Sequence, residues 1–264
     1  MHKLHQIRGP SPHFLASHFQ QKAMPPSVTS PATAPGHTLS FDISKLSKKS
    51  INGYTHEIRV VSEFEGYFAV IPAKTASGKD LFDAVHKFVA STYNAQGHRV
   101  MKAHADAEGV MQSMISVFGA VGILLTLSPP GQHAQRVERY TQQLNKGTRA
   151  TLDALPYELP PELMLYLEMS VADGMTLIPN TASFPLSPYE KVHKCRRKFH
   201  AQFPFLPFGS VCMVAMGEAK RASIAHDKGI HVQNVVKSEV GVCLGADPDI
   251  YFISSQRMRL YRGE

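Results

Sequence analysis

Cysteine and long apolar runs are scarce in this 264-residue chain. Its three cysteines, Cys195, Cys212 and Cys243, are odd in number and far apart, which argues against a disulfide framework or a zinc ribbon and suits a reducing compartment. The longest apolar run, Val117 to Leu127, has 11 residues, whereas a membrane-spanning helix needs about 20. The N-terminus also lacks the apolar segment of a secretory signal. We expect a soluble intracellular protein, nuclear or cytoplasmic, with no membrane partner.

Two common catalytic motifs are also missing. The stretch "FGSVC" lacks the G-x-S-x-G pattern that places a serine nucleophile on a sharp turn. The stretch "GILLTLSPPG" lacks the Gly-Lys-Ser/Thr ending of a phosphate-binding loop. These absences argue against a serine hydrolase of that type and against a P-loop nucleotidase.

Negative charge is scarce in the last quarter of the chain. Residues 191–264 hold 12 Lys/Arg against 6 Asp/Glu, whereas residues 1–190 hold 16 against 15. A basic tail on a near-neutral body favours a nucleic-acid partner, because phosphates attract clustered cations. A solvated basic face without a partner is an equally good interpretation of charge alone.

The hydrophobic pattern divides the chain into three parts. Residues 1–37 comprise a weakly helical, histidine-rich segment and a Pro/Ser/Thr-rich linker. Residues 38–185 predict the order β-β-β-α-β-α-β-α-α, in which apolar residues alternate in the strands and recur every three to four positions in the helices. This order is typical of an α/β fold whose mixed sheet is flanked by helices. Beyond residue 185 the helices are expected to stop, and residues 186–264 predict a basic linker and a small, truncated β-rich module.

Three carboxylates occupy notable places in this pattern. Asp42 lies mid-way along the first strand, opposite its apolar residues, and Asp106 ends the fourth strand. Glu138 follows a Pro-Pro-Gly break, early in a long polar helix. If the first and fourth strands are neighbours, the three could converge, and converging carboxylates repel unless a divalent cation such as Mg²⁺ neutralises them. Taken singly, each is more simply a hydrogen-bonding or solvated residue.

Several short stretches occur in the order found in one family. They are "LSFDI", "GYFAVIPAKT", "HADAEGV", "SPPGQHAQRVER", "SPYEKV" and "FPFGSVCMV". Together they resemble the catalytic core of integrases of copia-type retrotransposons, which are retroviral-like enzymes. The resemblance implies an RNase H-like fold with a five-stranded mixed sheet. It also implies an Asp42, Asp106, Glu138 triad that holds Mg²⁺ or Mn²⁺, as two ions when DNA is bound.

The resemblance further implies what the chain binds. The partners would be element ends and target DNA, the active form would be a homo-oligomer, and the chain would be part of a larger polyprotein. On the Glu138 helix, the face that touches DNA would carry Gln142, Asn145 and Arg149, with Gln132 in the preceding loop. The run "KVHKCRRKF" adds four candidate phosphate contacts, which are Lys194, Arg196, Arg197 and Lys198. A solvated helix face and a solvated linker remain the alternatives for these two groups.

The sequence also departs from the family. Only 31 residues separate Asp106 from Glu138, fewer than is usual, and no cysteine precedes Cys195. Without a thiolate pair, the upstream His-His-Cys-Cys zinc module of the family cannot close. The leading hypothesis is therefore an integrase core that performs 3′-end processing and strand transfer. The alternatives are a catalytically decayed, nucleic-acid-binding remnant and an RNase H-like nuclease that does not join strands.

Overall fold

The computed structural model describes residues 32–107, 109–128, 135–155, 157–197, 208–215, 218–228, 231–234, 238–243 and 252–254. The helical segment expected over residues 1–24, with its histidines, lies outside these ranges. So does the last expected strand, "RMRLYRG".

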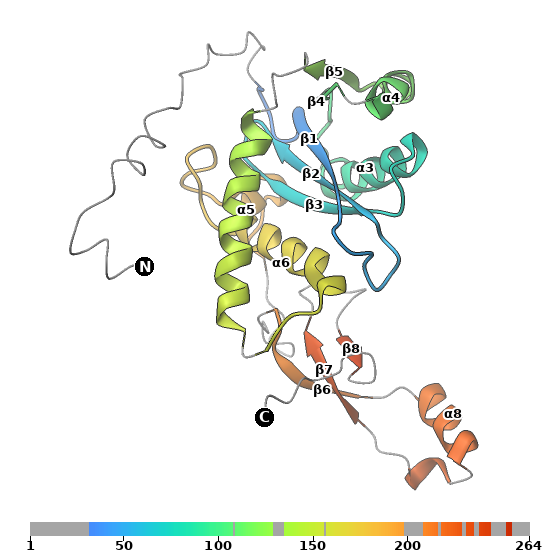
Figure 1. Cartoon of the computed structure of the whole chain (residues 1–264). Helices are drawn as coiled ribbons and strands as arrows, with labels where there is room; N and C mark the ends of the chain where they lie inside the picture. The colour runs from blue at the N-terminus through green and yellow to red at the C-terminus, as the bar shows by residue number, and fades with distance from the viewer. Residues whose placement is uncertain are drawn as a thin grey trace, which may run out of the picture. The chain divides into compact units, whose positions relative to one another are not determined.

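Five strands form one mixed sheet (Figure 1). They are β1 (Thr38–Lys45), β2 (His56–Ser62), β3 (Phe68–Ala73), β4 (Lys102–Asp106) and β5 (Leu124–Ser128). The spatial order is β3-β2-β1-β4-β5. Strand β2 is antiparallel to β1 and β3, whereas β4 is parallel to β1 and β5. The predicted mixed five-stranded sheet is confirmed.

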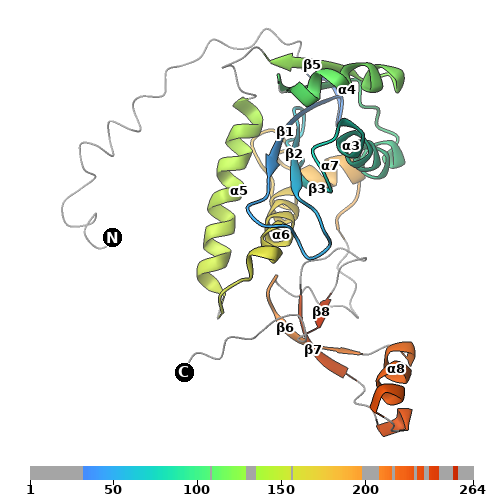
Figure 2. The same ribbon diagram turned by 45° about the vertical axis from the view of Figure 1, so that its right-hand side comes forward.

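Helices cover both faces of this sheet (Figures 1 and 2). Helices α3 (Gly78–Thr92) and α4 (Gly109–Ala120) lie on one face. Helices α5 (Gln135–Ala154) and α6 (Met164–Thr176) lie on the other. Short 3₁₀ turns occur at Asn94–Gln96, Pro161–Leu163 and Val232–Asn234. The predicted order of strands and helices from residue 38 to residue 180 is confirmed.

The face under α3 and α4 carries the larger core. Its strand residues alternate along the sequence, as in Leu39 and Phe41 on β1, because successive strand side chains point to opposite faces. Helix α3 contributes buried residues at helical spacing, namely Leu81, Val85 and Val89. Fully burying a side chain of this size contributes about 1.5 to 3 kcal/mol. This face of the sheet is therefore covered by apolar packing and is buried from solvent.

The opposite face mixes apolar and charged residues. Its apolar cluster joins β2 and β3 to α5 and α6, and includes Val61, Phe68, Val137, Leu144 and Leu165. The alternate residues of β1 that point to this face are Ser40, Asp42 and Ser44, all polar. Helices α5 and α6 therefore cover a surface that retains charged groups.

A buried carboxylate ties the β2–β3 turn to two other segments. Glu65 is fully buried and accepts hydrogen bonds from Ser62 Oγ at 2.6 Å, Tyr93 Oη at 3.1 Å and the backbone N–H of Gly36 at 3.3 Å. Burial raises the pKa of Glu65, and the hydrogen bonds partly oppose that rise. Gly36 has φ +69, and a Cβ there would lie 2.3 Å from Cδ1 of Tyr93. The start of the described chain is therefore held on the sheet by close contact as well as by Glu65.

The expectation that helices stop after residue 185 is wrong. Helix α7 (Pro188–His193) begins with a capping box, in which Ser187 and Glu190 each bond the backbone N–H of the other, and with Pro188 in its first turn. Its Val192 is fully buried in the core under α3 and α4, although α7 lies beyond the boundary expected at residue 185. A second helix, α8 (Glu218–Lys228), interrupts the strands that follow. The stretch "SPYE" carries the sequence signal for this helix, because Ser187 and Glu190 have the spacing of a capping box.

Three of the expected late strands form a separate antiparallel sheet. They are β6 (Val211–Ala215), β7 (Ser238–Cys243) and β8 (Phe252–Ser254), in that spatial order. The turn before β6 contacts the segment between α5 and α6, because Tyr157 Oη donates to the carbonyl of Gly209 at 2.8 Å. Phe208 packs with Leu159 and Leu163. None of the described helices is long and apolar enough to cross a membrane.

Replacing Glu65 by alanine is expected to lower the free energy of unfolding by about 2 to 4 kcal/mol, because three buried donors lose their acceptor and a cavity remains. Urea denaturation of wild type and variant measures the difference. The matched control is Glu158→Ala, since Glu158 is exposed. A loss at Glu65 no greater than the loss at Glu158 would show that the buried network contributes nothing.

Candidate functional site

Asp42 and Asp106 lie on neighbouring strands. Strands β1 and β4 are parallel, and their register pairs Phe41 with Ala105. Continuing this register by one residue places Asp42 opposite Asp106. Both side chains point away from the buried face that holds Phe41 and Ala105, because strand residues alternate. Since adjacent strands lie about 4.8 Å apart, the two carboxylates share one small region of the sheet. The predicted adjacency of the first and fourth strands is confirmed.

Polar groups surround this pair. Both aspartates are half-buried, and both make interactions with other residues. His104 lies two residues before Asp106 on the same face, with Nε2 3.9 Å from Oε1 of Glu63. Ser40 Oγ donates to the same Glu63 oxygen at 2.7 Å. His104 therefore has a carboxylate partner on the same face of the sheet.

Glu138 lies in the first turn of α5 and is exposed. Strand β5 ends at Ser128, which pairs in register with Asp106, and α5 begins only seven residues later. Helix α5 therefore starts from the end of the sheet where Asp106 lies (Figure 1). An acidic residue at this position is stabilised by the partial positive charge of the helix N-terminus. Gln132 lies in the preceding segment, outside the described residues.

The polar stripe predicted on α5 faces solvent. Glu138, Gln142, Asn145 and Arg149 are all exposed, whereas Val137 and Leu144 one position before are buried. The helix thus presents a continuous polar surface that starts at Glu138. A role for this surface in DNA binding remains a prediction.

Within the described ranges, no group of three or more His, Cys, Asp or Glu residues lies close enough to hold one metal ion. Asp42 and Asp106 supply hard carboxylate oxygens, which suit Mg²⁺ because this ion binds through one or two carboxylates and keeps several waters. The donors of this pair therefore fit the ion. Glu138 on α5 would have to supply the third carboxylate ligand.

The basic segment after α7 is largely engaged within the protein. Arg196 Nε lies 3.1 Å from Oε1 of Glu190, and Arg197 forms an ion pair with Asp173 of α6. Lys194 is exposed at the left-handed C-cap of α7. Lys198 lies outside the described residues. Arg196 and Arg197 thus have an intramolecular role that the sequence did not reveal.

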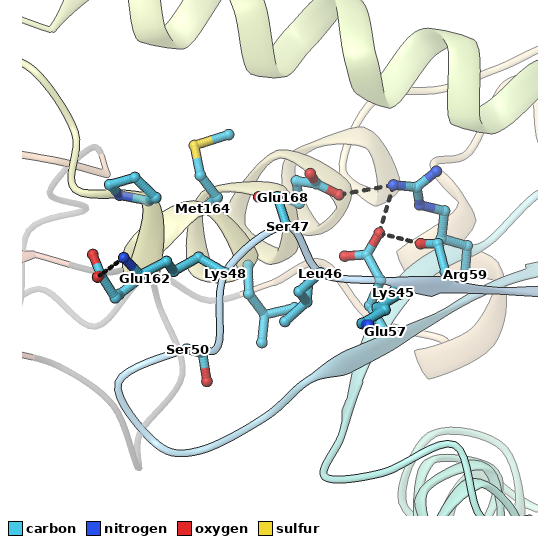
Figure 3. Close-up of a pocket in the computed structure, with 13 residues that line it drawn as sticks. Lys45, Leu46, Ser47, Lys48, Ser50, Glu57, Arg59, Glu162, Met164 and Glu168 are labelled. Carbon is cyan, nitrogen blue, oxygen red and sulfur yellow. Dashed lines mark hydrogen bonds and ion pairs between the residues drawn. The ribbon is translucent and has the colours of Figure 1, made fainter.

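A charged cluster between the sheet and α6 was missed at the sequence level. Arg59 Nη2 donates to Oε1 of Glu57 at 2.5 Å and to Oε2 of Glu168 at 3.2 Å (Figure 3). Ser44 Oγ donates to the same Glu57 oxygen at 2.8 Å. The Glu57 side chain is 2% exposed, and the cluster lines a cavity of about 260 Å³ between α6 and the β1–β2 loop. Alternation in "HEIRVV" could have revealed it, since Glu57 and Arg59 share a strand face with the buried Val61.

The cluster alters the acidity of one of its members. Burial raises the pKa of Glu168 to about 7, the charge of Glu57 adds to the rise, and Arg59 opposes it. The folded protein therefore binds a proton at Glu168 more tightly than the unfolded chain does.

The solved structures similar to this chain include retroviral integrases, all with TM-scores below 0.5. No protein-family model and no curated protein matches the sequence. Among solved structures, the HTLV-2 integrase catalytic core domain in complex with magnesium has a TM-score of 0.45 and 13% identity, over 61% of this chain and 98% of that chain. The catalytic core domain of BIV integrase has a TM-score of 0.44 and 15% identity, over 60% of this chain and 95% of that chain.

A third structure matches over a longer span. The simian T-cell lymphotropic virus intasome in complex with the PP2A regulatory subunit B56 gamma has a TM-score of 0.49 and 14% identity, over 96% of this chain and 95% of that chain. At such identities the likeness concerns the path of the chain and not the roles of its residues.

Glu168→Gln is expected to flatten part of the pH dependence of stability. Because the pKa of Glu168 is raised from 4.5 to about 7 on folding, its stabilising contribution is fully present below 4.5 and is lost as the pH rises through about 7. Glutamine does not titrate, so the variant lacks this loss. Urea midpoints between about pH 4 and about pH 8 test the difference between the two proteins.

Other groups titrate in the same range, and the comparison removes their effect. Burial lowers the pKa of His193, whose opposite contribution is common to wild type and variant. Glu158→Gln, at an exposed position, is the matched control. Parallel pH curves for wild type and Glu168→Gln would contradict the raised pKa.

Proposed function

We propose that this chain is the catalytic core of a copia-type integrase, a metal-dependent enzyme that processes DNA 3′ ends and joins them to target DNA. The observation that carries the proposal is the parallel register of β1 and β4, which brings Asp42 and Asp106 together on one face of the sheet. The sequence stretches that resemble the family lie around both aspartates and Glu138.

The proposed chemistry consists of two displacements at phosphorus. Water first attacks a phosphodiester near the 3′ end of the element, so that a P–O bond breaks and a 3′ hydroxyl is released. That hydroxyl then attacks a phosphodiester of the target, and one P–O bond forms as another breaks. Mg²⁺ or Mn²⁺, as two ions with DNA bound, would stabilise the attacking and leaving oxygens. Asp42 and Asp106 would hold the ions, and Glu138 would complete the set.

Helix α5 would contact DNA through the polar residues that come after Glu138 along its exposed side. Gln142, Asn145 and Arg149 extend along its exposed side, and hydrogen bonds from such residues to phosphates would fix the register of a DNA end. Gln132 and the basic residues Lys194, Arg196, Arg197 and Lys198 belong to the same proposal. The active form would be a homo-oligomer in the nucleus or cytoplasm, and the chain would be part of a larger polyprotein.

One observation favours a second candidate function. No three potential metal ligands lie together in the part of the chain that the structure describes, which is the arrangement expected of a catalytically decayed remnant that still binds nucleic acid. An RNase H-like nuclease is a third candidate, distinguished by its products, since it would cleave DNA without joining strands.

Asp106→Asn is expected to abolish strand joining and most of the rise in melting temperature that Mn²⁺ gives the wild type. A neutral amide is a poorer ligand for a hard cation, and a ligand that binds only the folded state raises its stability. Glu138→Gln should lose the Mn²⁺-induced rise in the same way, because it also replaces a carboxylate by a neutral amide. The measurements are thermal melts with and without saturating Mn²⁺, and a joining assay on labelled DNA ends.

Asp83→Asn, at an exposed position on α3, is the matched control and should leave both readouts unchanged. A wild type that binds DNA but shows no Mn²⁺ shift would support the decayed remnant. A wild type that cleaves without joining would support the nuclease.

Arg149→Glu is expected to weaken DNA binding at low salt and to reduce the slope of log K against log salt by about 1, because one phosphate contact is lost. Lys87→Glu makes the same charge change on α3, across the sheet from α5, and serves as the control. Fluorescence anisotropy with a labelled duplex across a salt series measures both. Equal slopes for the two variants would show that the polar side of α5 is only a solvated surface.

A further inference from the structure

The residue opposite Asp42 on the neighbouring strand is an arginine. Antiparallel pairing of β1 with β2 places Asp42 directly across from Arg59, on the same face of the sheet. The Cβ atoms of such a pair lie about 4.5 to 5.5 Å apart, which is well within the reach of an arginine side chain. An ion pair between them would be easy to form, and it would neutralise a proposed metal ligand.

The guanidinium is instead held two register pairs away along β2. Its Nη2 donates to Glu57 and Glu168, and the Glu57 carboxylate also receives the hydroxyl of Ser44, the residue across from Glu57. The arginine thus leans along β2 towards the cavity under α6 (Figure 3). Its side chain is 15% exposed, and those of Glu57 and Glu168 are 2% and 16% exposed. Little water is available to replace either carboxylate as a partner for the cation.

We propose that Glu57 and Glu168 are positioning residues for the metal site, which act by holding the Arg59 guanidinium away from Asp42. This inference rests on the proposed function, because it concerns the metal that Asp42 would bind. Without the two carboxylates, the cation turns to the nearest remaining anion on the same face, which is Asp42. The metal ion then has to displace a guanidinium, and it meets an additional positive charge beside its site.

The arrangement also accounts for the presence of two acids around one base. Arg59 joins β2 to α6, and a single carboxylate would be enough for such a link. Two carboxylates, one from β2 and one from α6, give the guanidinium two acceptors that lie together beside the cavity. The second carboxylate is therefore the part of the cluster that the proposal explains and that a simple structural ion pair does not.

The test compares Mn²⁺ binding by four proteins, measured by calorimetry on the full chain. In Glu57→Gln/Glu168→Gln both amides keep the shape of the side chains but remove their charges, and Mn²⁺ affinity should fall by about 10- to 100-fold, as is usual when a residue that supports a metal ligand is lost. Adding Arg59→Met to this pair removes the cation and should restore the affinity. Glu168→Gln alone should give an intermediate loss.

The rescue separates positioning from simple destabilisation, because a third substitution in a damaged fold would weaken binding further. The proposal is overturned if the double variant binds Mn²⁺ as the wild type does, or if the triple variant binds no better than the double. Should the double variant fail to fold, wild type, Glu168→Gln and Arg59→Met/Glu168→Gln are compared instead. Mn²⁺ affinity should fall in Glu168→Gln and return in Arg59→Met/Glu168→Gln, and the absence of either change overturns the proposal. A wild type that does not bind Mn²⁺ at all overturns the proposed function, and this inference with it.

Discussion

The Arg59 guanidinium between two carboxylates is the interaction on which this face of the sheet depends. Glu57 comes from β2 and Glu168 from α6, and without a cation between them the two acids would repel across a nearly dry interface. Breaking such a cluster is costly because it leaves an uncompensated buried charge. The packing of α6, and through the shared apolar cluster that of α5, therefore rests partly on an electrostatic contact.

The two faces of the sheet have different roles: one forms the core and the other carries the charged groups. Its face under α3 and α4 is apolar and supplies most of the core, so the opposite face can carry Asp42, Asp106 and Arg59 without loss of the fold. Parallel pairing of β1 and β4 brings residues from distant parts of the chain to one place, and the short connection from β5 starts α5 nearby. The candidate site is thus a product of topology more than of local sequence.

Alternation and helical periodicity in the sequence were sufficient to predict the five core strands and the four helices around them. They do not by themselves place Asp42 beside Asp106, because that prediction depends on the condition that the first and fourth strands are neighbours. Helix α7 was missed because six residues are too few for a periodic signal, and only the cap formed by Ser187 and Glu190 marks it. The pairing of Arg197 with Asp173 could not be predicted, since it depends on how α7 returns to α6.

Gly66 shows how finely the position of α5 is set. Its backbone has φ +71, and a Cβ at this point would lie 2.1 Å from the hydroxyl of Tyr140 and 2.8 Å from Nδ2 of Asn180. Tyr140 also stacks on Phe68, with ring centroids 5.5 Å apart. The Tyr140 hydroxyl therefore occupies space at the β2–β3 turn that only a glycine leaves open. A side chain at residue 66 would displace the Tyr140 ring or the Asn180 amide. Tyr140 lies two residues from Glu138 on α5, so the surroundings of that carboxylate depend on a glycine in the β2–β3 turn, outside the strands that carry the proposed ligands.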